Sequence, residues 1–249
     1  MLRHLTITSG VALAIGLLPL YANAAMMPSN ISAAVADPTR PAEDKARDAD
    51  RKPAECIAFA GLKEGDQVVD FLPGGGYFTR IFSKAVGPKG HVLALLPAGV
   101  PEKFTLGAKA IAADKTNYGN VTEAEEKASE LPAGSLDLFW TAQNYHDLKN
   151  LPNADTVAFD KAVFAALKPG GIYLIIDHSA PAGSGASDTN TLHRIEQKVV
   201  EDEVVSAGFK LDGTSDLLKN PNDPRTAKVF DPSIRGKTDQ FVLKFRKPK

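Results

Sequence analysis

The stretch GDQVVDFLPGGGYFTR, residues 65–80, decides the fold of this chain. Residues 68–72 are apolar except for Asp70, a run typical of a strand that is buried on both faces. The consecutive glycines Gly74, Gly75 and Gly76 allow a sharp turn and leave no side chain in the way of a ligand. Apolar residues then recur with helical spacing from Phe78 to Ala85. The stretch predicts strand, tight turn and helix, and in an α/β sheet this corner is where nucleotide-like ligands bind.

The segments that follow repeat the alternation of strand and helix. Largely apolar runs at 91–96 and 136–141 predict the second and fourth strands, and a continuously apolar run at 172–176 predicts the fifth. A short third strand is expected at 120–123, and helical periodicity appears between the strands and again at 192–207. This alternation indicates a mainly parallel sheet covered by helices. A strand is expected from Phe209 onward and another at 239–245, with no helix between them, so the last strand should be antiparallel.

Composition sets limits on the class of protein. The chain has 249 residues, of which 43% are hydrophobic and 24% charged, and this is typical of a globular protein with one sizeable core. A net charge of −1 gives no support for nucleic acid as a partner. The single cysteine, Cys56, excludes an internal disulfide and a cysteine-based metal cluster.

The N-terminal residues resemble a targeting segment. Arg3 precedes an apolar run at 11–20, which is too short to span a bilayer, and Ala22-Asn23-Ala24 is a small-x-small cleavage site. We therefore expect a signal peptide at 1–24, a flexible arm at 25–40 and one domain at 41–249. The mature protein is expected to be periplasmic or secreted, with no stable membrane anchor after cleavage.

The glycine corner fits two ligand-binding patterns unequally. The dinucleotide fingerprint G-x-G-x-x-G accounts for Gly74 and Gly76 but meets Thr79 at its third glycine. An acid followed after three residues by G-x-G accounts for Asp70, Gly74 and Gly76, and it resembles the first motif of class I S-adenosylmethionine (SAM) dependent methyltransferases. A turn that merely closes an α/β unit is the third possibility.

The resemblance to these methyltransferases covers nearly the whole mature chain, and in particular the chain resembles secreted, predicted methyltransferases of Gram-negative bacteria. The segments that carry it are VVDFLPGGGYFT at 68–79, NYHDL at 144–148, LKPGGIYLIIDH at 167–178, EVVSAGF at 203–209 and RGKTDQFVLKF at 235–245. It implies a Rossmann-like sheet of seven mostly parallel strands in the order 3-2-1-4-5-7-6, with strand seven antiparallel and helices on both faces. It also implies SAM as cofactor, a small-molecule acceptor, and cofactor contacts from Asp70, Gly74, Gly75, Gly76 and Asn144.

Two positions depart from the family pattern. Leu72 stands where these enzymes usually have another glycine, and the predicted second strand ends in Leu96-Pro97 without the usual acid that binds the ribose hydroxyls. The missing acid weakens a SAM interpretation and an NAD interpretation alike.

Polar residues follow the predicted fourth and fifth strands, and the carboxyl ends of parallel strands share one edge of a sheet. His146 could act there as a general base, with Asp147 and Tyr145 as further catalytic candidates. Alternatively, Asp147 and Asn144 cap the next segment and His146 merely packs. A divalent metal held by His146, Asp147, Asp177 and His178 competes with a simple hydrogen-bonded network of the same residues.

The long connection at 219–238 is expected to cover this same edge and to be held by charge pairs of Arg225 or Arg235. Three function classes remain open: a methyltransferase, a ligand- or metal-binding protein on the same fold, and another enzyme that uses the histidine–aspartate cluster. The absence of G-x-S-x-G counts against a serine hydrolase.

Overall fold

One seven-stranded sheet organises the computed structural model, which describes residues 27–97, 99–153 and 155–249. The predicted signal peptide at 1–24 lies outside the described residues. The strand order is β3-β2-β1-β4-β5-β7-β6, with β7 antiparallel to both of its neighbours and the other pairings parallel. The strands are β1 (Gln67–Phe71), β2 (His91–Leu96), β3 (Val121–Glu125), β4 (Leu136–Ala142), β5 (Leu167–His178), β6 (Lys210–Ser215) and β7 (Gln240–Arg246). The predicted topology is confirmed.

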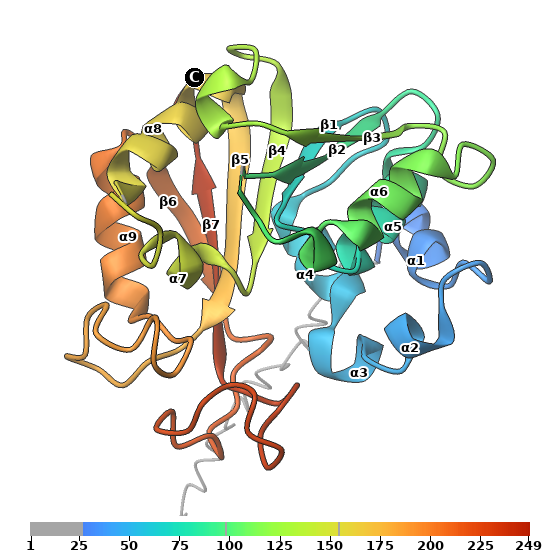
Figure 1. The fold of residues 1–249 in the computed structure, drawn as a ribbon. Helices are drawn as coiled ribbons and strands as arrows, with labels where there is room; N and C mark the ends of the chain where they lie inside the picture. The colour runs from blue at the N-terminus through green and yellow to red at the C-terminus, as the bar shows by residue number, and fades with distance from the viewer. Residues whose placement is uncertain (1–26, 98, 154) are drawn as a thin grey trace, which may run out of the picture.

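Helices cover both faces of this sheet (Figure 1). One face carries α1 (Ser29–Val35), α4 (Pro53–Ala60), α5 (Tyr77–Val86) and α6 (Leu106–Ala113), and the other carries α7 (Tyr145–Leu148), α8 (Thr156–Ala166) and α9 (Gln197–Ser206). The short helices are α2 (Ala42–Lys45), α3 (Asp48–Arg51), η1 (Glu102–Phe104) and η2 (Ala128–Glu130).

The largely apolar sequences of the central strands are explained by the two hydrophobic cores that the helices form on the two faces of the sheet. Trp140 packs against Phe78 on the α5 side, with ring centroids 4.7 Å apart. Its neighbour Phe139 points to the opposite face, where its ring lies 5.4 Å from that of Tyr173. Because successive side chains of a strand alternate between faces, both must be apolar where both faces are covered.

The sequence predicted a flexible arm at 25–40, and the structure corrects this prediction for residues 29–35. Ser29–Val35 forms helix α1, whose Ile31 is fully buried. The side chain of Asn30 donates a 3.0 Å hydrogen bond to the carbonyl of Ala85 at the end of α5. A helix this short has too few apolar positions to show a period, so its packing against α5 decides its structure.

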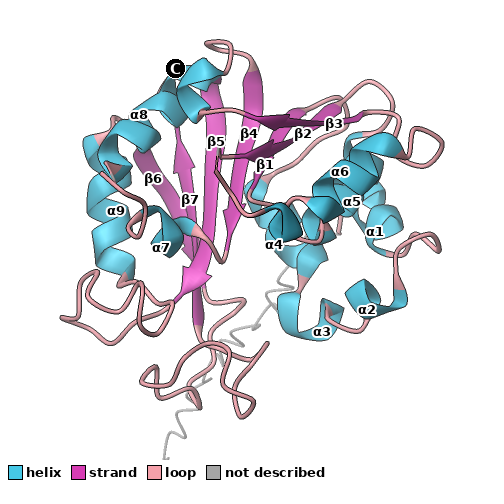
Figure 2. Cartoon of the chain, in the orientation of Figure 1, coloured by secondary structure: helices cyan, strands magenta, loops and turns pink. Residues whose placement is uncertain are grey.

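Loops gather at the end of the sheet where β5 ends and β7 begins (Figure 2). The connection at 219–238 lies there as predicted, and Arg225 holds it through a 3.0 Å ion pair with Asp239. Among the described residues, Arg235 makes no such pair. None of the helices in the described part of the chain is long and apolar enough to cross a membrane.

Candidate functional site

A cavity of about 580 Å³ lies at the carboxyl ends of β1, β4 and β5. It joins the glycine turn to the polar residues after β4 and β5, so the two sequence motifs belong to one site. The residues that line it are Arg47, Arg51, Leu72, Pro73, Gly74, Gly75, Tyr77, Val100, Phe104, Ala142, Gln143, Asn144, His146, Asp147, Leu151, His178, His193, Val229 and Phe230.

The glycine turn is held from two sides. The Asn144 side-chain amide donates to the carbonyls of Phe71 (3.0 Å) and Leu72 (3.2 Å), which fixes the start of the turn. On the other side, a Cβ added at Gly107 of α6 would lie 2.7 Å from the Gly74 carbonyl oxygen. Leu72 itself has a φ of 50°, so it adopts the left-handed backbone usual for glycine. The backbone geometry of the motif is therefore kept although a glycine is replaced.

The predicted cofactor ligands divide into two groups. Gly74, Gly75 and Asn144 line the cavity. Gly76 is the N-cap of α5 with a φ of 79°, and Asp70 is buried beneath the turn, where it accepts a 2.6 Å hydrogen bond from the Thr79 hydroxyl. Neither Gly76 nor Asp70 lines the cavity, and both help to position the turn.

The buried carboxyl of Asp70 is expected to make the stability of the protein depend on pH. Burial raises the pKa of Asp70 to about 7, against the hydrogen bond from Thr79 and the charge of Arg51, which lower it. The raised pKa means that the carboxyl stabilises the fold most when protonated, and that stability falls as pH rises from about 4 to 7.

We expect Asp70→Asn to remove this pH dependence. The free energy of unfolding of the variant, relative to the unmodified protein, should rise by roughly 4 kcal/mol between pH 4 and pH 8, at about 1.4 kcal/mol per pKa unit. Urea unfolding at both pH values measures this difference, in which the titration of other groups cancels. A constant difference across the range would show that Asp70 is ionised in the folded protein throughout.

His146 is fixed by the buried carboxylate of Asp177. The Asp177 side chain accepts hydrogen bonds from the His146 backbone (2.7 Å) and from Nδ1 of its ring (2.8 Å). Burial lowers the pKa of His146, but the charge and hydrogen bond of Asp177 outweigh it, so the net pKa lies above its ordinary value. With Nδ1 engaged, Nε2 is the ring atom that faces the cavity.

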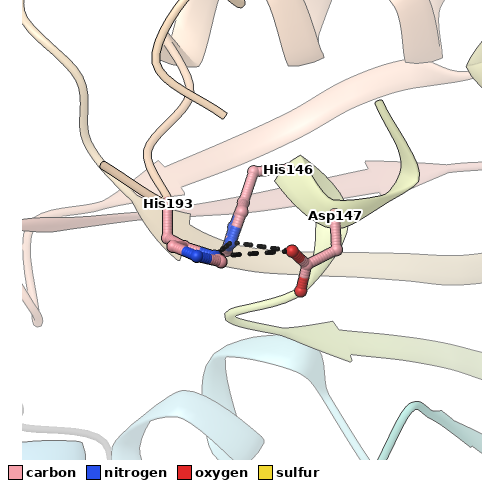
Figure 3. Close-up of side chains that lie close together, drawn as sticks. All are labelled: His146, Asp147 and His193. Atoms are coloured by element: carbon pink, nitrogen blue, oxygen red, sulfur yellow. Dashed lines mark hydrogen bonds and ion pairs between the residues drawn. The ribbon is translucent and has the colours of Figure 1, made fainter. Parts of the chain in front are cut away.

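The side chains of His193 and Asp147 converge on Nε2 of His146 (Figure 3). His193 places Nδ1 at 3.3 Å from it, and Asp147 places Oδ1 at 3.4 Å. His193 was missed by sequence reasoning, because the helix predicted from Leu192 begins five residues later, at Gln197. His193 instead occupies an irregular segment with a φ of 57°. The hydrogen bond from the Ile195 amide to the His178 carbonyl, 3.0 Å long, holds this segment beside β5.

Burial sets the surroundings of two further predicted site residues, Tyr145 and His178. Tyr145, predicted as catalytic, is fully buried away from the cavity, and its hydroxyl donates to Asp160 at 2.8 Å. This position argues against any contact with reacting atoms. His178 lines the cavity, but Thr238 bonds its Nδ1 at 2.7 Å and burial lowers its pKa to about 3, so it stays neutral.

Two arginines that the sequence did not single out flank the glycine turn. Arg47 and Arg51 line the cavity beside Gly74 and Tyr77, and the Arg51 guanidinium lies 4.3 Å from the centre of the Tyr77 ring. Burial lowers the pKa of Arg51 to about 10, which leaves it cationic at neutral pH. Within the described residues its guanidinium has no ion pair, so a positive charge faces the cavity without an acidic partner.

Solved structures with this architecture identify the fold. A SAM-dependent methyltransferase from Aquifex aeolicus superposes with a TM-score of 0.60 over 83% of this chain and 98% of that one, at 21% identity. The chain has the fold of SAM-dependent methyltransferases. In that fold, the cavity described above lies at the carboxyl ends of the central strands, where open α/β sheets bind their ligands.

Sequence relatives point in the same direction. The chain is 26% identical to the ubiquinone/menaquinone biosynthesis C-methyltransferase UbiE of Pseudomonas paraeruginosa, over 76% of this chain and 65% of that protein. It is 31% identical to UbiE of Vibrio vulnificus, over 76% of this chain and 64% of that protein. The chain thus spans about 65% of the length of these curated relatives. No protein-family model matches it.

Proposed function

We propose that this protein is a SAM-dependent methyltransferase that acts on a small-molecule acceptor. The observation that carries the proposal is the single cavity that joins the glycine turn to His146, Asp147 and His193. The methyltransferase fold and the UbiE-like relatives support it, although the latter are matched over part of their length. The names of these relatives refer to quinone biosynthesis, and the proposal does not carry their acceptor over to this chain.

The cavity divides naturally between cofactor and acceptor. The glycine turn and the N-terminus of α5 supply open backbone and a partial positive charge on one side. Arg51 stands beside them and suits the carboxylate of the methionyl group. His146 and Asp147 lie across the cavity, where the acceptor must approach in line with the sulfonium methyl.

The direct test is a calorimetric titration of the purified protein with SAM and with S-adenosylhomocysteine. We expect both to bind, because they share the adenosine and the amino-acid carboxylate. Failure of both to bind would overturn the proposal. The second candidate, a binding protein on the methyltransferase fold, would then be favoured, since β2 ends at Leu96 and neither Leu96 nor Pro97 supplies an acid for the ribose.

We expect Arg51→Gln to weaken SAM and S-adenosylhomocysteine binding by roughly 10- to 150-fold, the worth of a hydrogen bond to a charged group. Methylthioadenosine lacks the carboxylate, and its affinity should change little. The control is Lys161→Gln, an exposed basic residue on α8. An equal loss for all three ligands would place Arg51 elsewhere than at the carboxylate.

We also propose that the protein is exported to the periplasm or beyond. Support comes from the charged start, the short apolar run at 11–20 and the Ala22-Asn23-Ala24 site. Mass spectrometry of the exported protein should find a chain that begins at Ala25. An intact N-terminus in a membrane fraction would contradict this proposal.

A further inference from the structure

We propose that His146, Asp147 and His193 form a binding site for a zinc-like divalent cation at the acceptor side of the cavity. The role given to this cation rests on the proposed methyltransferase function, but its binding does not. Two imidazoles and one carboxylate are a ligand set that zinc commonly takes when it keeps one position open for a water or substrate.

The distances between the three ligand atoms favour a metal. His146 Nε2 lies 3.3 Å from His193 Nδ1 and 3.4 Å from Asp147 Oδ1, and the last two atoms are 3.6 Å apart. A tetrahedral ion with bonds of about 2.1 Å holds its ligand atoms about 3.4 Å apart. The three atoms therefore form one face of a tetrahedron of the right size (Figure 3).

A plain hydrogen-bonded network explains these distances less well. Hydrogen bonds from a ring nitrogen to oxygen are normally about 2.7–3.2 Å long. The His146–Asp177 bond, at 2.8 Å, falls within this range, whereas the two distances from imidazole nitrogens to Asp147 Oδ1, 3.4 and 3.6 Å, exceed it. His146 thus makes an ordinary hydrogen bond to Asp177 through Nδ1, whereas its Nε2 lies farther from Asp147, at the spacing of two ligands of one metal ion.

The surroundings of His146 are those of a metal-binding histidine. Asp177 is fully buried and accepts the Nδ1 proton, which leaves the Nε2 lone pair directed at the other two ligands. The backbone amides of His146 and His178 donate to the same carboxylate at 2.7 and 2.8 Å, so the imidazole orientation is fixed in advance. Asp177 therefore orients His146 and does not itself bind the metal. The proposed ligand set differs from the one that the sequence suggested, because His193 takes the place of Asp177 and His178.

The position of the cluster gives the cation a role in methyl transfer. All three ligands line the cavity that contains the glycine turn, so the fourth position faces the acceptor. A zinc-like cation lowers the pKa of a bound hydroxyl or thiol. The acceptor then loses its proton to solvent, its oxygen or sulfur bonds to the methyl carbon, and the carbon–sulfur bond of SAM breaks to release S-adenosylhomocysteine. We infer an acceptor that bears a hydroxyl or thiol group.

The binding test uses full-length protein without a histidine tag, treated with chelator and then titrated with zinc. We expect about one zinc per chain, and cobalt in its place should give the intense visible bands of a tetrahedral site. His193→Ala, chosen because this side chain is about 31% exposed and lies outside the core, should weaken zinc binding by more than about 100-fold. Asp177→Asn should weaken it about 10- to 100-fold.

The matched control is His91→Ala, because His91 contacts Thr122 on the sheet and lies outside the cavity. Zinc affinity that is absent in the unmodified protein, or unchanged in His193→Ala, would overturn the metal proposal and leave His146 with Asp177 as a metal-free base. SAM titrations on the same samples separate the two proposals. Loss of SAM binding with intact zinc binding would count against the methyltransferase alone.

Discussion

Replacing Gly75 with valine is expected to abolish SAM binding while leaving the protein folded. Gly75 lines the cavity, and its backbone lies outside the left-handed region that disfavours larger residues. A Cβ added there meets no atom within 4 Å, so the new side chain would enter open space and occupy the volume of the cofactor. Since cofactor and side chain cannot share this volume, we expect the affinity to fall by more than about 100-fold, or 2.7 kcal/mol.

The neighbouring glycines make less decisive targets. A Cβ at Gly76 would lie 2.0 Å from Cδ1 of Ile111, and the φ of 79° adds strain. Gly74 has room for a Cβ but has a φ of 56°. Strain of this kind costs about 1–3 kcal/mol, so either substitution would mix damage to the fold with damage to the site.

Gly75 therefore separates the two effects, and Gly75→Ala provides a graded control. Calorimetric titration with SAM should rank the glycine, alanine and valine forms in order of decreasing affinity, while their thermal unfolding midpoints stay close together. If Gly75→Val binds SAM as the unmodified protein does, the cofactor does not lie against this turn, and the division of the cavity proposed here is wrong.

The fold could be predicted because its determinants are local and repeated. The largely apolar run at 68–72 and the glycines after it favour a strand and a turn through local sequence, and the later strands have the same character. The missing helix before residues 239–245 was enough to predict the antiparallel last strand. His146 and Asp147 could be placed at the site for the same reason, since they directly follow a predicted strand.

The remaining site residues depend on tertiary contacts that no short segment reveals. Arg51 belongs to a four-residue helix, α3, whose position follows from packing of the N-terminal segment rather than from any periodicity. His193 lies before α9 in a segment fixed by hydrogen bonds to His178 and to Val229 of the distant connection at 219–238. Tyr145 adjoins His146, but one step along a helix turns a side chain by about 100 degrees, away from the cavity.

Removing the carboxylate of Asp223 is expected to cost about 3–5 kcal/mol of the free energy of unfolding. Arg194 and Asp223 form a 2.9 Å ion pair in which both side chains are fully buried. Arg194 also donates to the carbonyls of Ser179 (2.9 Å) and Ala227 (3.0 Å), so its guanidinium is fully engaged. Asp223→Ala leaves this cation buried without its counter-charge, and that is the source of the large penalty.

Urea unfolding of Asp223→Ala measures this loss of stability. Two control variants separate the effect of the unpaired cation from that of losing any ion pair or packing volume. Asp216→Ala removes an exposed pair with Lys219 and should change stability by less than about 1 kcal/mol. The double variant Arg194→Met, Asp223→Leu replaces the pair by apolar side chains and should be more stable than Asp223→Ala alone. If the double variant is the least stable of the three, packing volume rather than the unpaired cation dominates.

The same ion pair should also influence the site, because it joins the connection at 219–238 to the segment that carries His193. Arg194 is the next residue after His193, and the Val229 amide donates a 3.2 Å hydrogen bond to the Leu192 carbonyl. Asp223→Ala should therefore loosen His193 and weaken zinc binding at temperatures where the protein is still folded, while SAM affinity at the glycine turn changes much less. Equal losses of both affinities would indicate that the connection supports the whole cavity and not the metal side alone.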